Sequence, residues 1–199
     1  MSTASLVSQL VDSFKADGRI AIVGASLAGL RAAEALRENG FRGQLTIVGD
    51  EPHEPYDRPP LSKQVLKGWV PANHTKLPRL RPVDAHWRLG VAAVGLDRSN
   101  HQVLLADGEK LDYDRLLIAT GARARPWFNP DEAALKGLFT VRTCDDAATL
   151  AAALKERPRR VLIVGSGFVG SEIASVCREL GLAVTVAERS GGARPRRRR

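Results

Sequence analysis

The sequence predicts an α/β protein built on parallel sheets, and three observations lead to that prediction. Two apolar runs that each end in glycine, RIAIVG at residues 19–24 and RVLIVG at residues 160–165, are typical of strands buried on both faces. Helical periodicity follows each run, and a further apolar strand follows each helical stretch. Because a helical crossover connects parallel strands, the chain is expected to repeat one β-α-β unit, first around Gly24 and again around Gly165.

The first unit can be assigned element by element. Residues 4–14 are weakly amphipathic and predict a short leading helix. Residues 27–40 have helical spacing of apolar side chains and end at Asn39-Gly40, which is a typical helix stop. Residues 44–51 then provide the second apolar strand. Together with residues 19–24, these segments predict the first parallel pair.

The middle of the chain carries weaker signals. Proline-rich residues 51–63 predict an ordered loop, and a short helix is expected to begin within residues 63–67. An apolar run before the turn Asp107-Gly108 predicts a strand, and a strong strand is expected at residues 115–120. Residues 76–100 have a mixed pattern, so the middle of the chain is expected to contain a strand, a turn and a second strand before the second unit.

The second unit is preceded by an amphipathic helix that begins near Asp145. It consists of a strand at residues 160–165, a helix at 168–181 and a strand at 183–188. The expected domains are an N-terminal extension (1–18), a first dinucleotide-binding domain (19–145), the start of a second (146–189) and a basic disordered tail (190–199).

The second unit contains a complete dinucleotide-binding motif, Gly165-Ser-Gly167-Phe-Val-Gly170. The first glycine permits a tight turn, the second leaves room for a pyrophosphate, and the third lets helix and strand approach closely. The N-terminus of the helix then holds the phosphate. Glu188 ends the next strand, where a carboxylate can accept a hydrogen bond from a ribose 2′-hydroxyl. The Glu188 carboxylate favours binding of NAD. Arg189 beside it keeps NADP as an alternative cofactor.

The first motif, GASLAG at residues 24–29, departs from the full pattern. Ser26 replaces the second glycine, but its side chain is small and its hydroxyl can donate a hydrogen bond to a phosphate oxygen. Asp50 and Glu51 close the second strand and are the candidate acids for a ribose.

Composition and charge restrict the expected cellular location of the protein and the partners that it could bind. No run approaches the length of a membrane span and no leader is recognisable at the N-terminus, so a cytoplasmic protein is expected. Cys144 and Cys177 lack metal or redox spacing and are expected to be semi-buried thiols. The four histidines show no ligand spacing either, so no metal site is predicted. Five arginines in residues 190–199 supply most of the net charge of +8, so the basic character belongs to the tail.

Three stretches carry a family resemblance. AIVGASLAGLRAAEALRENGFRGQLTIVGDEPHEPYDRPPLSK and LDYDRLLIATGARARP resemble FAD-domain segments of the FAD-dependent ferredoxin reductases of bacterial oxygenase systems. These are relatives of putidaredoxin reductase, rubredoxin reductase and apoptosis-inducing factor within the pyridine nucleotide-disulfide oxidoreductase superfamily. VLIVGSGFVGSEIAS resembles the start of their NAD domain. The resemblance implies a Rossmann-like FAD-binding domain with a β-meander insertion, in a three-layer sandwich, followed by the first β-α-β unit of an NAD-binding Rossmann domain.

The resemblance also implies roles for particular residues. The implied FAD contacts are Gly24, Ser26, Ala28, Gly29, Asp50, Glu51, Arg58, Lys63, Ala93, Thr120, Gly121 and Arg142. The implied NADH contacts are Gly165, Gly167, Phe168, Val169, Gly170 and Glu188. Lys63, close to the flavin ring, and Glu172, near the nicotinamide, are the implied catalytic residues.

The implied activity is electron transfer from NADH through FAD to a ferredoxin-type iron–sulfur protein. The flavin performs the redox chemistry, while the protein aligns the cofactors and tunes their charge. Disulfide reductases of similar architecture carry a cysteine pair where this chain has LSKQVLKG, so a dithiol mechanism is excluded by residue type.

Family members continue well beyond the position of Glu188, so the resemblance implies a truncated N-terminal portion that a further chain could complete. A noncatalytic FAD- or NAD-binding module and a nonfunctional remnant remain alternatives to an active reductase. The arginine-rich ending at 190–199 is consistent with a shifted reading frame, and the rival interpretation is a basic tail that binds nucleic acid.

Overall fold

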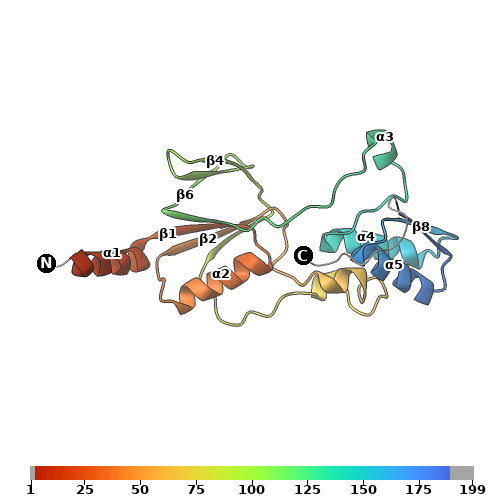
Figure 1. Ribbon diagram of the computed structural model, residues 1–199, viewed down its shortest axis with the longest axis horizontal. Coiled ribbons are helices and arrows are strands. Elements are labelled where there is room, and N and C mark those ends of the chain that lie inside the picture. Colours follow the sequence, from red (N-terminus) through yellow and green to blue (C-terminus); the bar gives the residue numbers. More distant parts are fainter. Residues whose placement is uncertain (1–2, 189–199) are drawn as a thin grey trace. The chain divides into compact units, whose positions relative to one another are not determined.

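A computed structural model describes residues 3–188 and divides the chain into two compact units (Figure 1). Unit 1 comprises residues 1–56 and 76–122, and unit 2 comprises residues 57–75 and 123–199, as far as these ranges are described. This division differs from the expected domain ranges, which placed residues 57–75 and 123–145 with the first domain. The reason is packing: Leu66 lies in the same buried cluster as Leu150 and Ile163 of unit 2.

Unit 1 is built on a parallel sheet with strand order β3-β2-β1-β7. The strand β1 (Arg19–Val23) pairs in parallel with β2 (Gln44–Gly49) on one side and with β7 (Arg115–Ile118) on the other. The strand β3 (His86–Leu89) extends the sheet beyond β2. The helix α2 (Leu27–Glu38) connects β1 to β2. The predicted parallel β-α-β unit is therefore confirmed.

Two further layers cover the faces of this sheet. Ile22 and Ile47 pack with Leu30 of α2 on one face, whereas Ala21 and Val48 pack with Val103 on the other. The second layer is an antiparallel sheet of β4 (Ala93–Asp97), β5 (Gln102–Leu105) and β6 (Lys110–Asp112), visible beside β1 and β2 in Figure 1. This arrangement confirms the expected meander and the three-layer sandwich.

The helix α1 (Thr3–Asp17) precedes β1 and is longer than the short leading helix expected at residues 4–14. Phe14 anchors its C-terminal end against Phe41, with ring centroids 5.8 Å apart. Leu6 and Leu10, further towards the N-terminus, are exposed. None of the helices within residues 3–188 has both the length and the apolar character of a bilayer-spanning segment.

Unit 2 contains the second β-α-β unit. The strand β8 (Val161–Val164), the helix α5 (Phe168–Glu179) and the strand β9 (Val184–Ala187) follow one another, and β8 pairs with β9 in parallel. The helix α4 (Cys144–Lys155) packs with them and begins with a capping box between Thr143 and Asp146. The short elements are the 3-10 helices η1 (Pro59–Ser62) and η2 (Ala72–His74) and the helix α3 (Pro130–Ala133).

The short helix expected at residues 63–67 is wrong in position. A 3-10 helix lies earlier, at Pro59–Ser62, and turns follow at residues 63–68. The two prolines at the start of η1 explain the difference, because their fixed φ favours the first positions of a helix. Neither cysteine forms a disulfide within the described residues, and both side chains are buried, more deeply than the semi-buried thiols expected.

Glu34 is a buried carboxylate that ties α2 to the segment before β3. Only 4% of its surface is exposed. One carboxylate oxygen accepts a hydrogen bond from the Leu80 amide at 2.7 Å, and the other accepts one from the Arg31 guanidinium at 2.6 Å. Burial alone would raise the pKa of Glu34, but the hydrogen bonds from Arg31 and Leu80 outweigh it and lower this pKa.

We expect Glu34→Ala to reduce the free energy of unfolding by about 2 kcal/mol at pH 7, because it leaves the Leu80 amide without its acceptor. The lowered folded-state pKa means that the stabilisation is complete above the ordinary value of about 4.3 and disappears as the pH falls through the lower folded value. Urea unfolding measures the difference at several pH values. Glu38→Ala is the matched control, since the Glu38 carboxylate is exposed and pairs with Arg81 at the surface. Equal unfolding midpoints for the two variants would contradict this role of Glu34.

Candidate functional site

The first glycine-rich turn connects β1 to α2 and leaves no space for side chains at two positions. Gly24 has φ +124°, and a Cβ atom there would lie 2.1 Å from the carbonyl oxygen of Ala119. A Cβ atom on Gly29 would lie 1.9 Å from the carbonyl oxygen of Gly24. Gly29 thus allows the N-terminus of α2 to approach the carboxyl end of β1 closely, and Gly24 allows the turn to lie against the end of β7.

The second turn repeats this construction between β8 and α5. Gly165 has φ +107°, and a Cβ atom on Gly170 would lie 2.1 Å from the carbonyl oxygen of Gly165. A Cβ atom on Gly165 or Gly167 would meet no atom of the described chain within 4 Å. The backbone beside Gly167 therefore faces open space at a helix N-terminus, which fits the close approach of a pyrophosphate. Phe168 and Val169, the next two predicted NADH contacts, are exposed.

Ser26 occupies the position of the second glycine in the first turn. It is the N-cap residue of α2 and has an extended backbone, yet its side chain makes no capping hydrogen bond. Serine at an N-cap ordinarily accepts a hydrogen bond from the helix backbone. The hydroxyl is therefore not committed to the helix, which fits the predicted contact with a phosphate oxygen.

The other predicted FAD residues of unit 1 follow strand ends. Asp50 follows β2, and Thr120 and Gly121 follow β7. Because β1, β2 and β7 are parallel neighbours, their carboxyl ends lie at one edge of the sheet together with Gly24. Ala93 instead begins β4 of the antiparallel sheet. The Glu51 carboxylate, the alternative acid, accepts a hydrogen bond from the Tyr56 hydroxyl.

Lys63 and Glu172, the two predicted catalytic residues, form an ion pair within unit 2. The Lys63 ammonium lies 2.7 Å from the Glu172 carboxylate, and the Ser62 hydroxyl donates to the same carboxylate oxygen at 2.5 Å. The hydrogen bonds from Lys63 and Ser62 lower the pKa of Glu172. The structure therefore brings together two residues that lie far apart in the sequence, and it adds Ser62, which the sequence reasoning did not select.

Unit 2 also contains two more of the predicted FAD residues. The Arg58 guanidinium donates a hydrogen bond to the Arg142 carbonyl oxygen at 2.7 Å. A hollow of about 200 Å³ lies beside the Lys63–Glu172 pair and is also lined by Gln64 and Trp69. The Gln64 Oε1 atom is buried and has no hydrogen-bond partner within the described residues.

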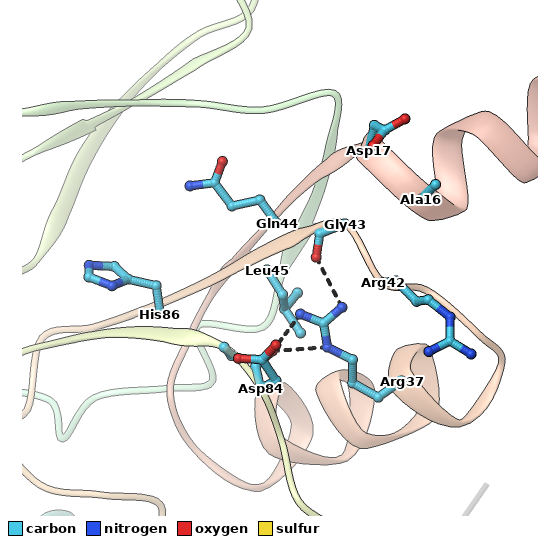
Figure 2. Close-up of a pocket in the computed structure, with 10 residues that line it drawn as sticks. Ala16, Asp17, Arg37, Arg42, Gly43, Gln44, Leu45, Asp84 and His86 are labelled. Atoms are coloured by element: carbon cyan, nitrogen blue, oxygen red, sulfur yellow. Dashed lines mark hydrogen bonds between the residues drawn. The ribbon is translucent and has the colours of Figure 1, made fainter.

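A larger hollow of about 380 Å³ lies where β2 and β3 begin, at the edge of the sheet opposite the glycine-rich turn (Figure 2). The Arg37 guanidinium lies between Asp84 and Gly43 in Figure 2 and donates to the carbonyl oxygens of both. The Arg37 side chain thus joins the end of α2 to the neighbouring backbone through these hydrogen bonds. No predicted site residue lines this hollow.

Glu188 follows β9 and contacts the second glycine-rich turn. The backbone amide of Ser166 donates to its Oε2 atom at 2.9 Å, and the Ser166 hydroxyl donates to the same atom at 3.1 Å. The sequence reasoning selected Glu188 but missed Ser166. The available signal was a hydroxyl residue between the first two glycines, at the turn that faces the end of the next strand.

These features define a class of protein: two parallel β-α-β units, each with a glycine turn at a helix N-terminus and an acid after the second strand, as in dinucleotide-binding proteins. The family model of the pyridine nucleotide-disulphide oxidoreductases matches residues 18–197, and the chain belongs to this family. Members of this family use FAD and NAD(H), in agreement with the predicted cofactors.

Individual relatives agree with this assignment. The chain is 42% identical over 171 residues to the ferredoxin–NAD(+) reductase component of the biphenyl dioxygenase system of Paraburkholderia xenovorans (strain LB400), covering 85% of this chain and 41% of the relative. It is 40% identical over 172 residues to rhodocoxin reductase of Rhodococcus erythropolis, with coverages of 85% and 40%.

Among solved structures, the covalent complex of putidaredoxin reductase with putidaredoxin matches with a TM-score of 0.77 and 34% identity, over 86% of this chain and 42% of the other. The predicted family resemblance and fold class are thus confirmed. The chain spans about two fifths of the length of the curated relatives that it matches.

Proposed function

We propose that the chain binds the pyrophosphate of FAD through unit 1 and that of NADH through unit 2, as part of a cytoplasmic flavoprotein that passes electrons from NADH to a ferredoxin-type iron–sulfur protein. The observation that carries this proposal is the common construction of the two turns. In each, the first glycine has a positive φ and the third approaches the carbonyl oxygen of the first so closely that no side chain fits. Two such turns in one chain support two dinucleotides rather than one.

The relatives support the rest of the proposal. Ferredoxin–NAD(+) reductase components of several dioxygenase systems are similar to this chain, and a similar solved structure contains putidaredoxin. The overall reaction would oxidise one NADH to NAD⁺, reduce two one-electron acceptors and release one proton. FAD, when bound, supplies the conversion between a two-electron donor and one-electron acceptors.

The residues of the chain bind and orient the cofactors. Backbone amides at the N-termini of α2 and α5 face the positions proposed for the two pyrophosphates. Asp50 and Glu188 are the proposed partners of the two riboses. Lys63 supplies a positive charge close to the proposed site of electron transfer, and Glu172 fixes the position of that charge through the 2.7 Å ion pair.

A second candidate function is dinucleotide binding without electron transfer. Within the described part of unit 2 the sheet contains two strands, and Leu162 and Val164 on one of its faces are 64% and 62% exposed. In unit 1 the corresponding face is covered by the antiparallel sheet, with Ala21 only 1% exposed. Within the described residues, unit 2 therefore buries less of its sheet than unit 1.

Isothermal titration of the purified chain with FAD and with NADH, each alone and then in sequence, tests the proposal. We expect one equivalent of each to bind, with neither displacing the other. Binding of both dinucleotides, together with reduction of an added ferredoxin by NADH in a separate assay, would support the reductase. Binding of both dinucleotides without reduction of the ferredoxin would support the second candidate. A chain that binds neither dinucleotide would refute both.

A further inference from the structure

Ser166 organises the carboxylate of Glu188 at the opening of the second glycine-rich turn. Two donors of Ser166, the backbone amide and the hydroxyl, reach the same carboxylate oxygen at 2.9 and 3.1 Å. Ser166 is itself fixed from α5, because the Ser171 hydroxyl donates to its carbonyl oxygen at 3.2 Å. The carboxylate is therefore oriented by a small hydrogen-bonded network that spans β8, α5 and β9.

The first turn has no hydroxyl at the position that corresponds to Ser166. Ala25 occupies the position that corresponds to Ser166, between the first glycine and the residue that replaces the second. It offers no hydroxyl to either candidate acid, Asp50 or Glu51, and the Glu51 carboxylate accepts a hydrogen bond from the Tyr56 hydroxyl. Both turns have the same backbone plan, so the serine hydroxyl is a specific feature of the second turn and not a requirement of the fold.

We propose that Ser166 is a positioning residue that sets the preference of unit 2 for NADH over NADPH by holding Glu188 in place. This inference rests on the proposed NADH site. A carboxylate at the end of this strand accepts a hydrogen bond from the ribose 2′-hydroxyl of NADH. The 2′-phosphate of NADPH would meet the same carboxylate as a like charge.

Restraint of the carboxylate affects both dinucleotides. A carboxylate that is already oriented loses less conformational entropy when it binds the 2′-hydroxyl, so NADH binds more tightly. A carboxylate that can rotate away would relieve the repulsion of a 2′-phosphate, and the Ser166 hydroxyl opposes that rotation. Loss of the hydroxyl should therefore weaken NADH binding and reduce the discrimination against NADPH.

Isothermal titration of the full chain with NADH and NADPH tests this directly, without a redox reaction. We expect Ser166→Ala to reduce the ratio of the NADPH and NADH dissociation constants by about tenfold, the loss of one hydrogen bond to a charged group. Glu188→Gln should reduce the ratio at least as much. Because Ser166 acts through Glu188, the double variant should resemble Glu188→Gln alone.

Thr149→Ala is the matched control, since it removes a hydroxyl of unit 2 that donates to the Asp145 carbonyl oxygen within α4. Thr149→Ala should leave the ratio of the two dissociation constants unchanged. Every variant should keep the melting temperature of the wild-type chain. A Ser166→Ala chain with the wild-type ratio, or additive effects in the double variant, would overturn the inference while the NADH site stands. A wild-type chain that binds neither dinucleotide would overturn the NADH site and the inference with it.

Discussion

Gly29→Ala is expected to destabilise unit 1 and abolish FAD binding, although alanine is the better helix former. Helix propensity alone would favour alanine by about 1 kcal/mol at this position in α2. The new Cβ atom would lie 1.9 Å from the Gly24 carbonyl oxygen, so helix and strand must move apart. We expect a net loss of about 2 kcal/mol in the free energy of unfolding.

Gly170→Ala is the matched variant, because its Cβ atom would lie 2.1 Å from the Gly165 carbonyl oxygen in the second turn. It is expected to abolish NADH binding and leave FAD binding unchanged, whereas Gly29→Ala should do the reverse. Urea unfolding and titration with each dinucleotide separate the two effects. Loss of the same dinucleotide in both variants, or stabilisation of either variant, would contradict the assignment of one site to each turn.

Lys63→Met is expected to slow the reduction of bound FAD by NADH on the order of 100-fold while both dinucleotides still bind. Methionine has a similar length but lacks the positive charge that the proposed site uses. The hydrogen bond from Lys63 is the largest cause of the lowered pKa of Glu172, so this pKa should rise in the variant. Stopped-flow reduction as a function of pH measures both the rate and this shift.

Lys67→Met provides the control for Lys63→Met. Lys67 also pairs with a glutamate of α5, since its ammonium lies 2.5 Å from Glu179, but it belongs to neither the predicted nor the proposed site. The Lys67→Met chain should reduce FAD at the wild-type rate. A similar loss of rate in the two variants would show that a lysine ion pair on this surface serves the structure of unit 2 and not electron transfer.

Local patterns were sufficient to predict both β-α-β units, because apolar runs, helical spacing and glycine turns are properties of short segments. The turn at Asp107-Gly108 between β5 and β6 was predictable for the same reason, whereas β4 was not, and the meander as a whole was expected only from the family resemblance. The Ser166–Glu188 contact was not predictable in this way, because it depends on how the end of β9 lies against the turn after β8. A single serine among glycines carries little information until that pairing is known.

The division of the chain was also beyond local reasoning. Residues 57–75 belong to unit 2, although the chain before and after them belongs to unit 1. Leu66 lies in the core of unit 2 because of long-range packing. The expected domain ranges group this segment with the first dinucleotide-binding domain, to which its neighbours in the sequence belong. The Lys63–Glu172 pair shows the same limit: the family resemblance selected both residues, whereas their direct contact and the role of Ser62 required the structure.

One chain is proposed to pass electrons from NADH to FAD, and the absorption spectrum of the FAD-loaded chain after anaerobic addition of NADH tests this proposal most directly. We expect the visible bands of oxidised flavin to disappear after one equivalent of NADH. A chain that binds both dinucleotides but keeps its flavin oxidised would contradict electron transfer. It would instead support dinucleotide binding alone.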